Sequence, residues 1–242
     1  MERSKITLQV IDTAIQAMCQ EVDDVKPQHE HWQHLDERDL FYELVVCVAS
    51  SQTVFETSVA VADQLKKRGL LDFNQGEDFL PQYRVLLQKT LENPVDVVVN
   101  GTPRKVRYRF KNRLTSFLAD TMLAIYGSGT SIKEILEEAH SPHDARKVLV
   151  NIVSGFGPKQ ASLFLRRIGY CSDLAVLDTH ILDYLELASL VKIKPYMLAK
   201  TTGYERIESE FLRIAERFGH AIGCVDLAMW ITMRVAKREF VR

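Results

Sequence analysis

The sequence predicts an all-α protein with about ten or more helices. Only 11 glycines and 7 prolines are spread over 242 residues, and long stretches contain neither. Apolar residues recur at spacings of three and four, as on one face of a helix, whereas the alternation typical of strands is scarce. Several of these periodic stretches also begin with helix-capping residues.

The first half of the chain carries five apolar helical stripes. They cover residues 6–18, 40–48, 55–65, 79–91 and 114–125. Asp36 stands before the second stripe as a candidate N-cap, and Gly69 follows the third, where the helix is expected to stop. We expect residues 21–33, 71–76 and 92–103 to be the loosest parts of the chain.

Three later helices are marked by the residues at their starts. In a capping box, a Ser or Thr hydroxyl and a Glu carboxylate three residues later satisfy free amides of the first turn. Proline suits the first helical position because it lacks the amide that would go unpaired there. The predicted starts are Ser131 with Glu134, Ser141 with Pro142, and Thr202 with Glu205.

Charge and cysteine usage restrict the class of protein. Lys and Arg number 31 and Asp and Glu 32, so the formal charge of −1 shows no overall basic excess of the kind seen in many nucleic-acid-binding domains. No C-x-x-C metal pair is present, and reduced thiols are expected at Cys19, Cys47, Cys171 and Cys224. Neither a signal segment nor an apolar run long enough to cross a bilayer is found, which predicts a cytoplasmic protein.

Residues 150–169 predict two helices joined by a tight turn. The turn reads Gly155-Phe156-Gly157, and the second helix begins at Pro158. Two glycines around one apolar residue permit positive φ and a close approach to another molecule, with Phe156 as the buried plug. The amides that begin the second helix suit a phosphate oxygen. An ordinary helical corner would carry the same pattern.

Lys159 and Asp178 are the candidate catalytic residues. Lys159 lies in the first turn of the second helix, where the helix dipole favours the neutral amine that a nucleophile requires. Further along, the apolar run 174–177 delivers Asp178 to the start of another helix, within the sequence Asp178-Thr-His180. The alternatives are an ordinary surface lysine and an aspartate that only caps its helix.

The strongest basic segment is residues 104–113. It has six basic side chains and no acidic one, with Tyr108 and Phe110 between them. Such a segment could follow a DNA backbone, or it could be a solvated loop or helix start. The basic residues are Arg104, Lys105, Arg107, Arg109, Lys111 and Arg113, and Lys147, Arg166 and Arg167 could add to the same face.

Together these segments resemble the helix–hairpin–helix superfamily of base-excision DNA glycosylases. The hairpin with Lys159 and the later Asp178-x-His180 fit the superfamily, and residues 43–53 look like its early helix. Residues 106–113 and 226–230 are similar to its small archaeal and bacterial 8-oxoguanine DNA glycosylase/lyase branch. The resemblance covers roughly residues 40–242. The chain lacks the iron–sulfur cysteines of other branches, so no cofactor is expected, and it also lacks a proline just before Asp178.

The resemblance implies a role for each matched residue. Lys159 would attack the sugar C1′ and form a Schiff base, and Asp178 would stabilise the developing positive charge. The other roles are a phosphate-holding turn at Gly155, Phe156 and Gly157, a phosphate contact at His180, a side chain that fills the gap of the flipped base at Gln52, and a base pocket at Trp230 and the carboxylate of Arg242. Trp230 on its apolar helix also fits a core residue.

The resemblance further implies two helical lobes with the active-site cleft between them. Residues 40–172 would form the lobe with the helix–hairpin–helix, residues 173–242 the other lobe, and residues 1–39 a helix and loop packed on the latter. The expected function is excision of an oxidised purine, most of all 8-oxoguanine, from double-stranded DNA, followed by β-elimination. A monomer at the nucleoid, with no membrane partner, is expected.

Two alternatives to this function stay open, and a cluster of histidines near the N-terminus is a further candidate site. The same chemistry could act on another modified base, for example in foreign DNA, or the chain could be a non-catalytic DNA-binding module. His29, His31 and His34 lack the spacing of a helical zinc pair and have no cysteine nearby. A polar loop rather than a metal site is expected there.

Overall fold

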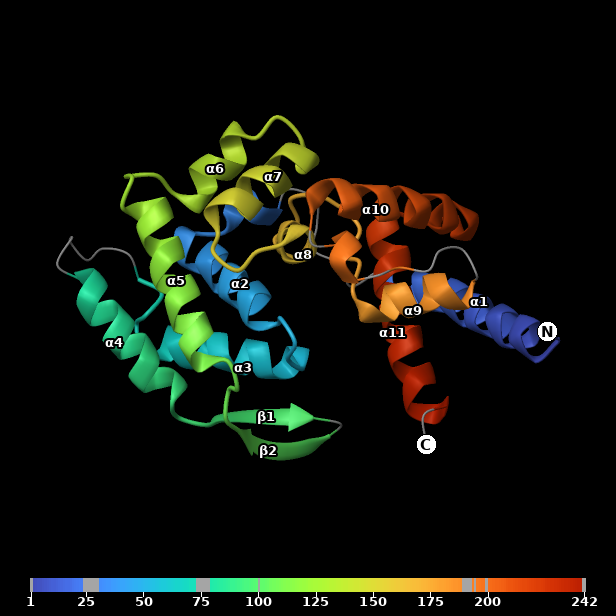
Figure 1. Cartoon of the computed structure of the whole chain (residues 1–242), viewed down its shortest axis with the longest axis horizontal. Helices are drawn as coiled ribbons and strands as arrows, with labels where there is room; N and C mark the ends of the chain where they lie inside the picture. Colours follow the sequence, from blue (N-terminus) through green and yellow to red (C-terminus); the bar gives the residue numbers. More distant parts are fainter. Residues whose placement is uncertain are drawn as a thin grey trace. The chain divides into compact units, whose positions relative to one another are not determined.

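The computed structural model describes residues 2–23, 31–72, 79–99, 101–188, 193, 195–198 and 200–240. Within these residues the chain forms eleven α-helices, three short 3-10 helices and one two-stranded sheet. The prediction of an all-α protein with ten or more helices is therefore confirmed. The chain divides into two compact units, unit 1 of Met1–His31 with Gly157–Arg242, and unit 2 of Trp32–Phe156 (Figure 1).

Unit 2 is built around α2 (Glu37–Ala49), a helix whose second half is apolar on every side. Along the second half of α2, Leu44 and the residues from Val45 to Cys47 have no exposed surface, as expected of a helix in the centre of a core. The helices of this unit are α2 (Glu37–Ala49), α3 (Phe55–Lys67), α4 (Phe79–Leu91), α5 (Lys111–Tyr126), α6 (Ile132–Glu138) and α7 (Pro142–Ile152), preceded by the 3-10 helix η1 (His31–His34).

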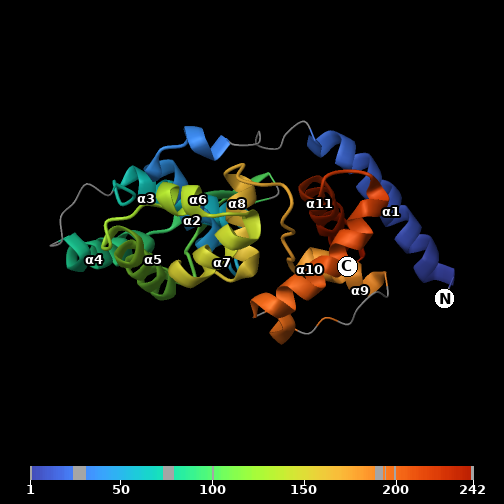
Figure 2. The same ribbon diagram turned by 90° about the horizontal axis from the view of Figure 1, so that it is seen from above.

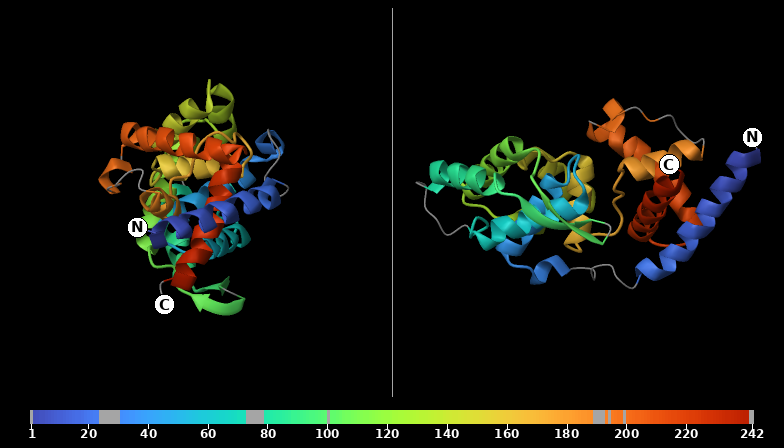
Figure 3. Two further views of the ribbon diagram at one scale, coloured as in Figure 1. Left: turned by 90° about the vertical axis from the view of Figure 1, so that its right-hand side faces the viewer. Right: turned by 90° about the horizontal axis from the view of Figure 1, so that it is seen from below.

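A β-hairpin in unit 2 corrects the expectation of loops and a helix start over residues 92–110. β1 (Val95–Val99) pairs antiparallel with β2 (Thr102–Val106), so that Val95 lies opposite Val106, at one edge of the unit (Figures 1 and 3). Val95 and Val97 are buried, and β1 packs on α3. The strand signal is weak because only β1 buries alternate residues, whereas β2 is almost wholly exposed.

Unit 1 joins the two ends of the chain in one core. Ile11, Ile15 and Cys19 of α1 are buried in the same cluster as Phe211 and Met229, and α1 lies against α11 (Figures 2 and 3). The elements of this unit are α1 (Glu2–Asp23), α8 (Pro158–Arg167), α9 (Thr179–Leu187), η2 (Pro195–Leu198), α10 (Thr201–Ala215), η3 (Glu216–Phe218) and α11 (Ile222–Phe240).

The units divide the chain at other places than the expected boundaries at 39/40 and 172/173. The second division falls inside the hairpin, between Phe156 and Gly157. α8 belongs to unit 1, where Arg166 pairs with Asp226 of α11 and the Gly223 amide donates to the Ser172 carbonyl. The motif therefore contributes one helix to each unit.

Most of the predicted helix starts are confirmed. Asp36, Ser131 and Ser141 each accept a hydrogen bond from the amide three residues on, and Pro142 is the first residue of α7. The predicted capping box at Thr202 is wrong, because α10 begins at Thr201 after Lys200, which caps nothing through its side chain. A Cβ at Gly203 would lie 2.0 Å from the Met197 carbonyl oxygen, so close packing with η2 determines where this helix begins.

All four cysteines are buried, and none of them forms a disulfide. Among the helices that the structure describes, none combines the length and apolar character needed to cross a membrane.

Candidate functional site

The turn between α7 and α8 is fixed against α5. Gly155 has φ +87°, and a Cβ there would lie 2.4 Å from the ring of Phe117. The Ser154 amide donates to the hydroxyl of Thr121, 3.0 Å away, and Phe156 is buried as predicted. Only a glycine fits at position 155, both for its φ and for the Phe117 contact.

Gly157 does not need the conformational freedom expected of it. Its φ is −108°, and a Cβ would meet only the Gln160 side chain at 3.6 Å, an ordinary contact. Gly157 is the N-cap of α8 and, having no side chain, leaves the amides of the first turn uncapped. Lys159 is the second residue of this helix and is half-buried. The start of α8 thus presents amide donors that suit an anion, next to a lysine.

The chain before Asp178 is a buried segment outside helix and strand, and three of its amides are held by side chains. No β-strand pairs with it in the part of the chain that the structure describes. The Ala175 amide donates to Glu208, 2.9 Å away, and the Leu177 amide to the Tyr204 hydroxyl, 3.0 Å away. That hydroxyl in turn donates to the Ala175 carbonyl at 2.7 Å. Buried backbone groups need such partners, and here they come from α10.

The Val176 amide is held by a buried ion pair. It donates to Oδ2 of Asp226, 2.5 Å away, and the same oxygen lies 2.5 Å from Nη1 of Arg166. Burial raises the pKa of Asp226 to about 6, against the lowering influence of Arg166 and the Val176 amide. Arg166 is therefore part of the interior of unit 1, and the expectation that it extends the basic face is wrong.

Asp178 is the N-cap of α9, and the cap uses one of its two carboxylate oxygens. Its Oδ1 accepts from the amides of His180 and Ile181 at 2.8 and 3.1 Å, which confirms the predicted N-cap. Both bonds end on the same oxygen, and the side chain is half-buried. The cap holds the carboxylate in place, and among the described residues no hydrogen bond to its second oxygen is found.

His180 and Trp230, which the resemblance gives separate roles, lie together. Their ring centroids are 6.1 Å apart in an edge-on arrangement, and the guanidinium of Arg234 lies 4.9 Å from the Trp230 ring centroid. Nδ1 of His180 is buried with no hydrogen-bond partner among the described residues. Burial lowers the pKa of His180, opposed by the nearby Asp178 carboxylate. The predicted pocket residue Arg242 lies outside the described residues.

In unit 2 the basic segment is carried on a framework of aromatic side chains. The guanidinium carbon of Arg113 lies 4.5 Å from the Phe110 ring centroid and 5.9 Å from that of Phe117, and Arg109 lies 5.3 Å from Phe110. Cation–π contacts of this kind hold a charged head while its outer side stays in water. The exposed basic residues are Arg104, Lys105, Arg107, Arg109 and Arg113, whereas Lys111 is half-buried and pairs with Glu92.

Gln52 lies in a turn that is tied to this segment. It is exposed, and its φ of 59° is the one positive value outside glycine in the described part of the chain. The Ala49 carbonyl accepts from the hydroxyls of Thr53 and Tyr108, at 2.7 and 3.1 Å. Tyr108 therefore links the Gln52 turn to the basic segment, and Phe117 links that segment to Gly155. The structure brings these three predicted DNA-binding features of unit 2 together.

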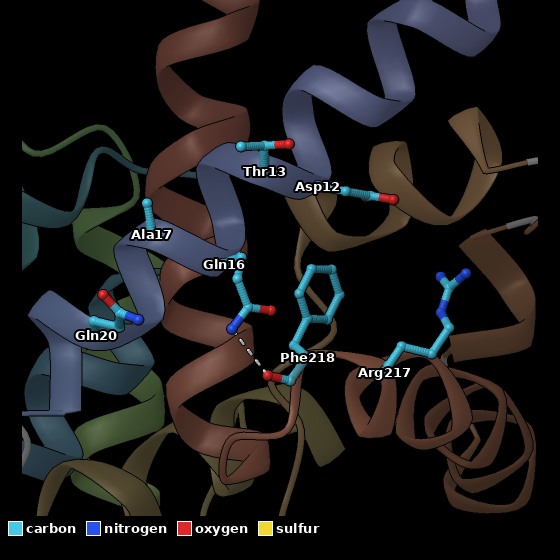
Figure 4. A pocket seen from close by; sticks show the side chains of 7 residues that line it. All are labelled: Asp12, Thr13, Gln16, Ala17, Gln20, Arg217 and Phe218. Carbon is cyan, nitrogen blue, oxygen red and sulfur yellow. Dashed lines mark hydrogen bonds between the residues drawn. The ribbon is translucent and has the colours of Figure 1, made fainter.

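Other predicted or hollow regions lie apart from these features. His31 and His34 are in η1, His29 lies outside the described residues, and the part that is described contains no group of three metal-binding side chains. A hollow of about 580 Å³ in unit 1 is lined by α1 and η3 residues, and the Gln16 amide donates across it to the Phe218 carbonyl at 3.1 Å (Figure 4). It includes none of the predicted site residues.

The site residues that the sequence analysis missed are Tyr204, Glu208 and Asp226. Each is buried, yet each lies on an apolar helix face, Tyr204 and Glu208 beside Ile207 and Phe211 in α10. An acidic residue within an apolar stripe was the available signal, because a buried carboxylate requires a partner.

The chain is similar to known proteins over more than half of its length. The family model Ogg-HhH, described as 8-oxoguanine DNA glycosylase, matches residues 85–220. An 8-oxoguanine DNA glycosylase/AP lyase of Saccharolobus islandicus is 33% identical over 135 residues, which are 55% of this chain and 63% of that protein. One of Korarchaeum cryptofilum is 26% identical over 194 residues, covering 80% of this chain and 79% of that protein. The chain thus spans less than two thirds of the Saccharolobus relative.

Solved structures show the same fold over almost the whole chain. The 8-oxoguanine DNA glycosylase of Methanocaldococcus jannaschii has a TM-score of 0.70 at 21% identity, covering 98% of this chain and 95% of that one. A second structure of the Methanocaldococcus jannaschii 8-oxoguanine glycosylase/lyase, in complex with a 15mer DNA containing 8-oxoguanine, has a TM-score of 0.63 at 23% identity over 95% and 91%.

Proposed function

The chain belongs to the 8-oxoguanine DNA glycosylase family, and from that premise we propose that it is a bifunctional DNA glycosylase/AP lyase. Its substrate is an oxidised purine, 8-oxoguanine, in double-stranded DNA. The observation that carries the proposal is that unit 1 contains both Lys159, at the uncapped start of α8, and a half-buried Asp178 on a segment held by buried side chains.

The reaction first requires the damaged nucleotide to leave the helix. A base inside a duplex cannot present its glycosidic bond to a side chain, and flipping it out costs a few kcal/mol. The backbone must be gripped and the gap filled. The start of α8 with Gly155 and Gly157 would take a phosphate, the residues of segment 104–113 would track the backbone, and Gln52 would enter the gap.

Lys159 and Asp178 then divide the chemistry. As the bond between C1′ and the base nitrogen breaks, positive charge develops on the sugar, and the Asp178 carboxylate stabilises it. The neutral Lys159 amine bonds to C1′, the base leaves with the electron pair and takes up a proton, and the sugar ring opens to an imine. The imine acidifies the neighbouring C2′ proton, whose loss expels the 3′ phosphate and nicks the strand.

Recognition of the base is assigned to the region around Trp230. Its ring offers a flat apolar face, and His180 lies against it. Burial lowers the pKa of His180, and its ring would contact a phosphate through a hydrogen bond. The terminal carboxylate of Arg242 would complete the pocket by accepting from the purine edge.

Borohydride trapping on a lesion-containing duplex tests the proposal. The wild-type protein is expected to form a covalent adduct with an 8-oxoguanine duplex, and Lys159→Gln none. Lys67→Gln, which removes an exposed lysine at the end of α3, is the matched control and should trap as the wild type does. An adduct that survives Lys159→Gln would overturn the assignment of the nucleophile.

The choice of substrate is tested separately. A panel of duplexes with different modified bases, and one with a preformed abasic site, is trapped under the same conditions. If an adduct forms faster with another modified base than with 8-oxoguanine, that base and not 8-oxoguanine is the substrate. Binding of every duplex without any adduct would leave the non-catalytic DNA-binding module as the function.

A further inference from the structure

A buried ion pair connects the helix of Lys159 with the segment of Asp178. Arg166 lies in the last turn of α8, the helix that begins at Pro158. Its Nη1 is 2.5 Å from Oδ2 of Asp226, and its Nη2 donates to the Gly223 carbonyl at 2.8 Å. The Asp226 side chain is only 5% exposed and that of Arg166 15%, so water screens the pair little.

The same carboxylate oxygen also holds the chain two residues before Asp178. The Val176 amide donates to Oδ2 of Asp226 at 2.5 Å. One atom of α11 is thereby bonded both to α8 and to the extended segment. All three parts belong to unit 1, so this connection lies inside one compact body.

The backbone around the pair is built to accommodate it. Gly223 donates its amide to the Ser172 carbonyl, 3.0 Å away. A Cβ on Gly223 would lie 3.1 Å from that carbonyl oxygen and 3.3 Å from Nε of Arg166. Such distances are tighter than a side chain normally makes, so a glycine leaves room for the guanidinium beside the start of α11.

We propose that the Arg166–Asp226 pair is a positioning device that keeps Asp178 in register with Lys159, and that base excision depends on it more than abasic-site cleavage does. The inference rests on the proposed function. Neither side chain reaches the reacting atoms in this role. Arg166 acts through α8, and Asp226 acts through the Val176 amide.

A buried ion pair such as Arg166–Asp226 adds little net stability to a fold. Desolvating two charges costs several kcal/mol per ion, and well-packed apolar residues of the same volume are often as stabilising or more so. The pair instead fixes geometry, because its hydrogen bonds hold α8, the start of α11 and the segment before Asp178 in one arrangement. A catalytic carboxylate needs such a fixed place, since a displacement of 1 Å can cost about 10²-fold in rate.

Measuring base excision and abasic-site cleavage side by side distinguishes a displaced Asp178 from a general loss of stability. Breaking the glycosidic bond needs both Asp178 and Lys159, because charge develops on a closed sugar. An abasic site already presents an aldehyde, so imine formation there depends chiefly on the lysine. A shifted Asp178 should therefore slow excision and spare abasic-site cleavage, whereas partial unfolding should lower both alike.

The experiment measures single-turnover excision from an 8-oxoguanine duplex and cleavage of a preformed abasic duplex, with thermal melting alongside. Arg166→Met, which keeps an unbranched apolar stem but removes the charge, is expected to lower excision by about 10²-fold. Its cleavage of the abasic duplex should stay within a few-fold of wild type. Arg166→Lys should recover part of the excision rate, because lysine can still pair with Asp226. Asp226→Asn should lie between these two variants.

Phe211→Leu serves as the matched destabilised control. It trims a fully buried side chain in the core of unit 1 and has no part in the pair. Equal losses of both activities in Arg166→Met, as in Phe211→Leu, would overturn the inference while leaving the proposed function intact. A wild-type protein that neither excises nor cleaves would instead refute the proposed function, and the inference with it.

Discussion

The basic segment of unit 2 and the Asp178 segment of unit 1 hold polar groups in opposite ways. Arg104, Arg107 and Arg109 are exposed, and the described side-chain partners of the basic residues in this segment are aromatic rings or exposed acids. Around Asp178 the amides of three consecutive residues are buried and bonded to side chains of α10 and α11. Charge is presented to water in one region, and polar atoms are hidden from it in the other.

This difference separates the tasks of binding and chemistry. Exposed charges act nearly independently, because solvent screens each from the next beyond about 10 Å. Buried bonds are coupled, since losing one leaves its partner unsatisfied in a medium of low dielectric constant. Substitutions should therefore have small additive effects in the basic segment and large, specific effects around Asp178.

The largest effect is expected at Asp178. Asp178→Asn should lower the excision rate by about 10²–10³-fold, because the neutral amide no longer stabilises the developing positive charge. Its melting temperature should hardly change, since Asn caps a helix about as well as Asp. Asp36→Asn, at the N-cap of α2, is the control and should leave both quantities unchanged. A large fall in stability with Asp178→Asn would show that the carboxylate serves mainly the fold.

The helices were predictable because their signal is local. Apolar residues three and four apart lie on one helix face, and α4 covers the same residues, Phe79–Leu91, that its stripe predicted. The β-hairpin was missed because one strand alone contributes to the core. The start of α10 was misplaced because the Met197 carbonyl against Gly203, a tertiary contact, overrides the capping pattern.

The site was only partly predictable for a related reason. Lys159 and Asp178 are recognisable from short motifs and from their places at helix starts. The side chains that hold the Asp178 segment lie far along the chain, since Glu208 binds an amide 33 residues away and Asp226 one 50 residues away. Hydrogen bonds between residues so far apart in the chain leave no periodic pattern in the sequence. Only the three-dimensional structure shows which buried acid meets which amide.

The hairpin turn should show an intermediate effect that depends on backbone rather than charge. Gly155→Ala places a methyl group 2.4 Å from the Phe117 ring at positive φ, and a loss of about 3 kcal/mol in the free energy of unfolding is expected. Gly157→Ala, two residues on, should cost less than about 1 kcal/mol because its φ is ordinary. Urea unfolding measures both. Equal losses in the two variants would contradict the contact with Phe117.

A smaller effect is expected for single arginines of the basic segment. Arg104→Ala and Arg113→Ala should each weaken binding to undamaged duplex and reduce the slope of log affinity against log salt by about 0.9. The losses in the double variant should add, because Arg104 is an exposed residue of β2 whereas Arg113 contacts the rings of Phe110 and Phe117, so the two share no described partner. The single-turnover excision rate at saturating protein should stay the same. An excision rate that falls along with affinity would mean that this segment also aligns the substrate.

The smallest effect is expected for the pair across the β-hairpin. Lys105 Nζ and Asp96 Oδ1 are 3.1 Å apart, but their side chains are 71% and 80% exposed. Solvent screening and side-chain entropy reduce such pairs to about 0–1 kcal/mol, so a double-mutant cycle of Lys105→Met and Asp96→Asn should give a coupling energy in that range. The same cycle on Arg166 and Asp226, with charges 2.5 Å apart and buried, should give a clearly larger value, because each single variant leaves an unpaired buried charge. Similar coupling energies in the two cycles would mean that burial does not distinguish the two regions, and the division between independent surface charges and coupled interior bonds would fail.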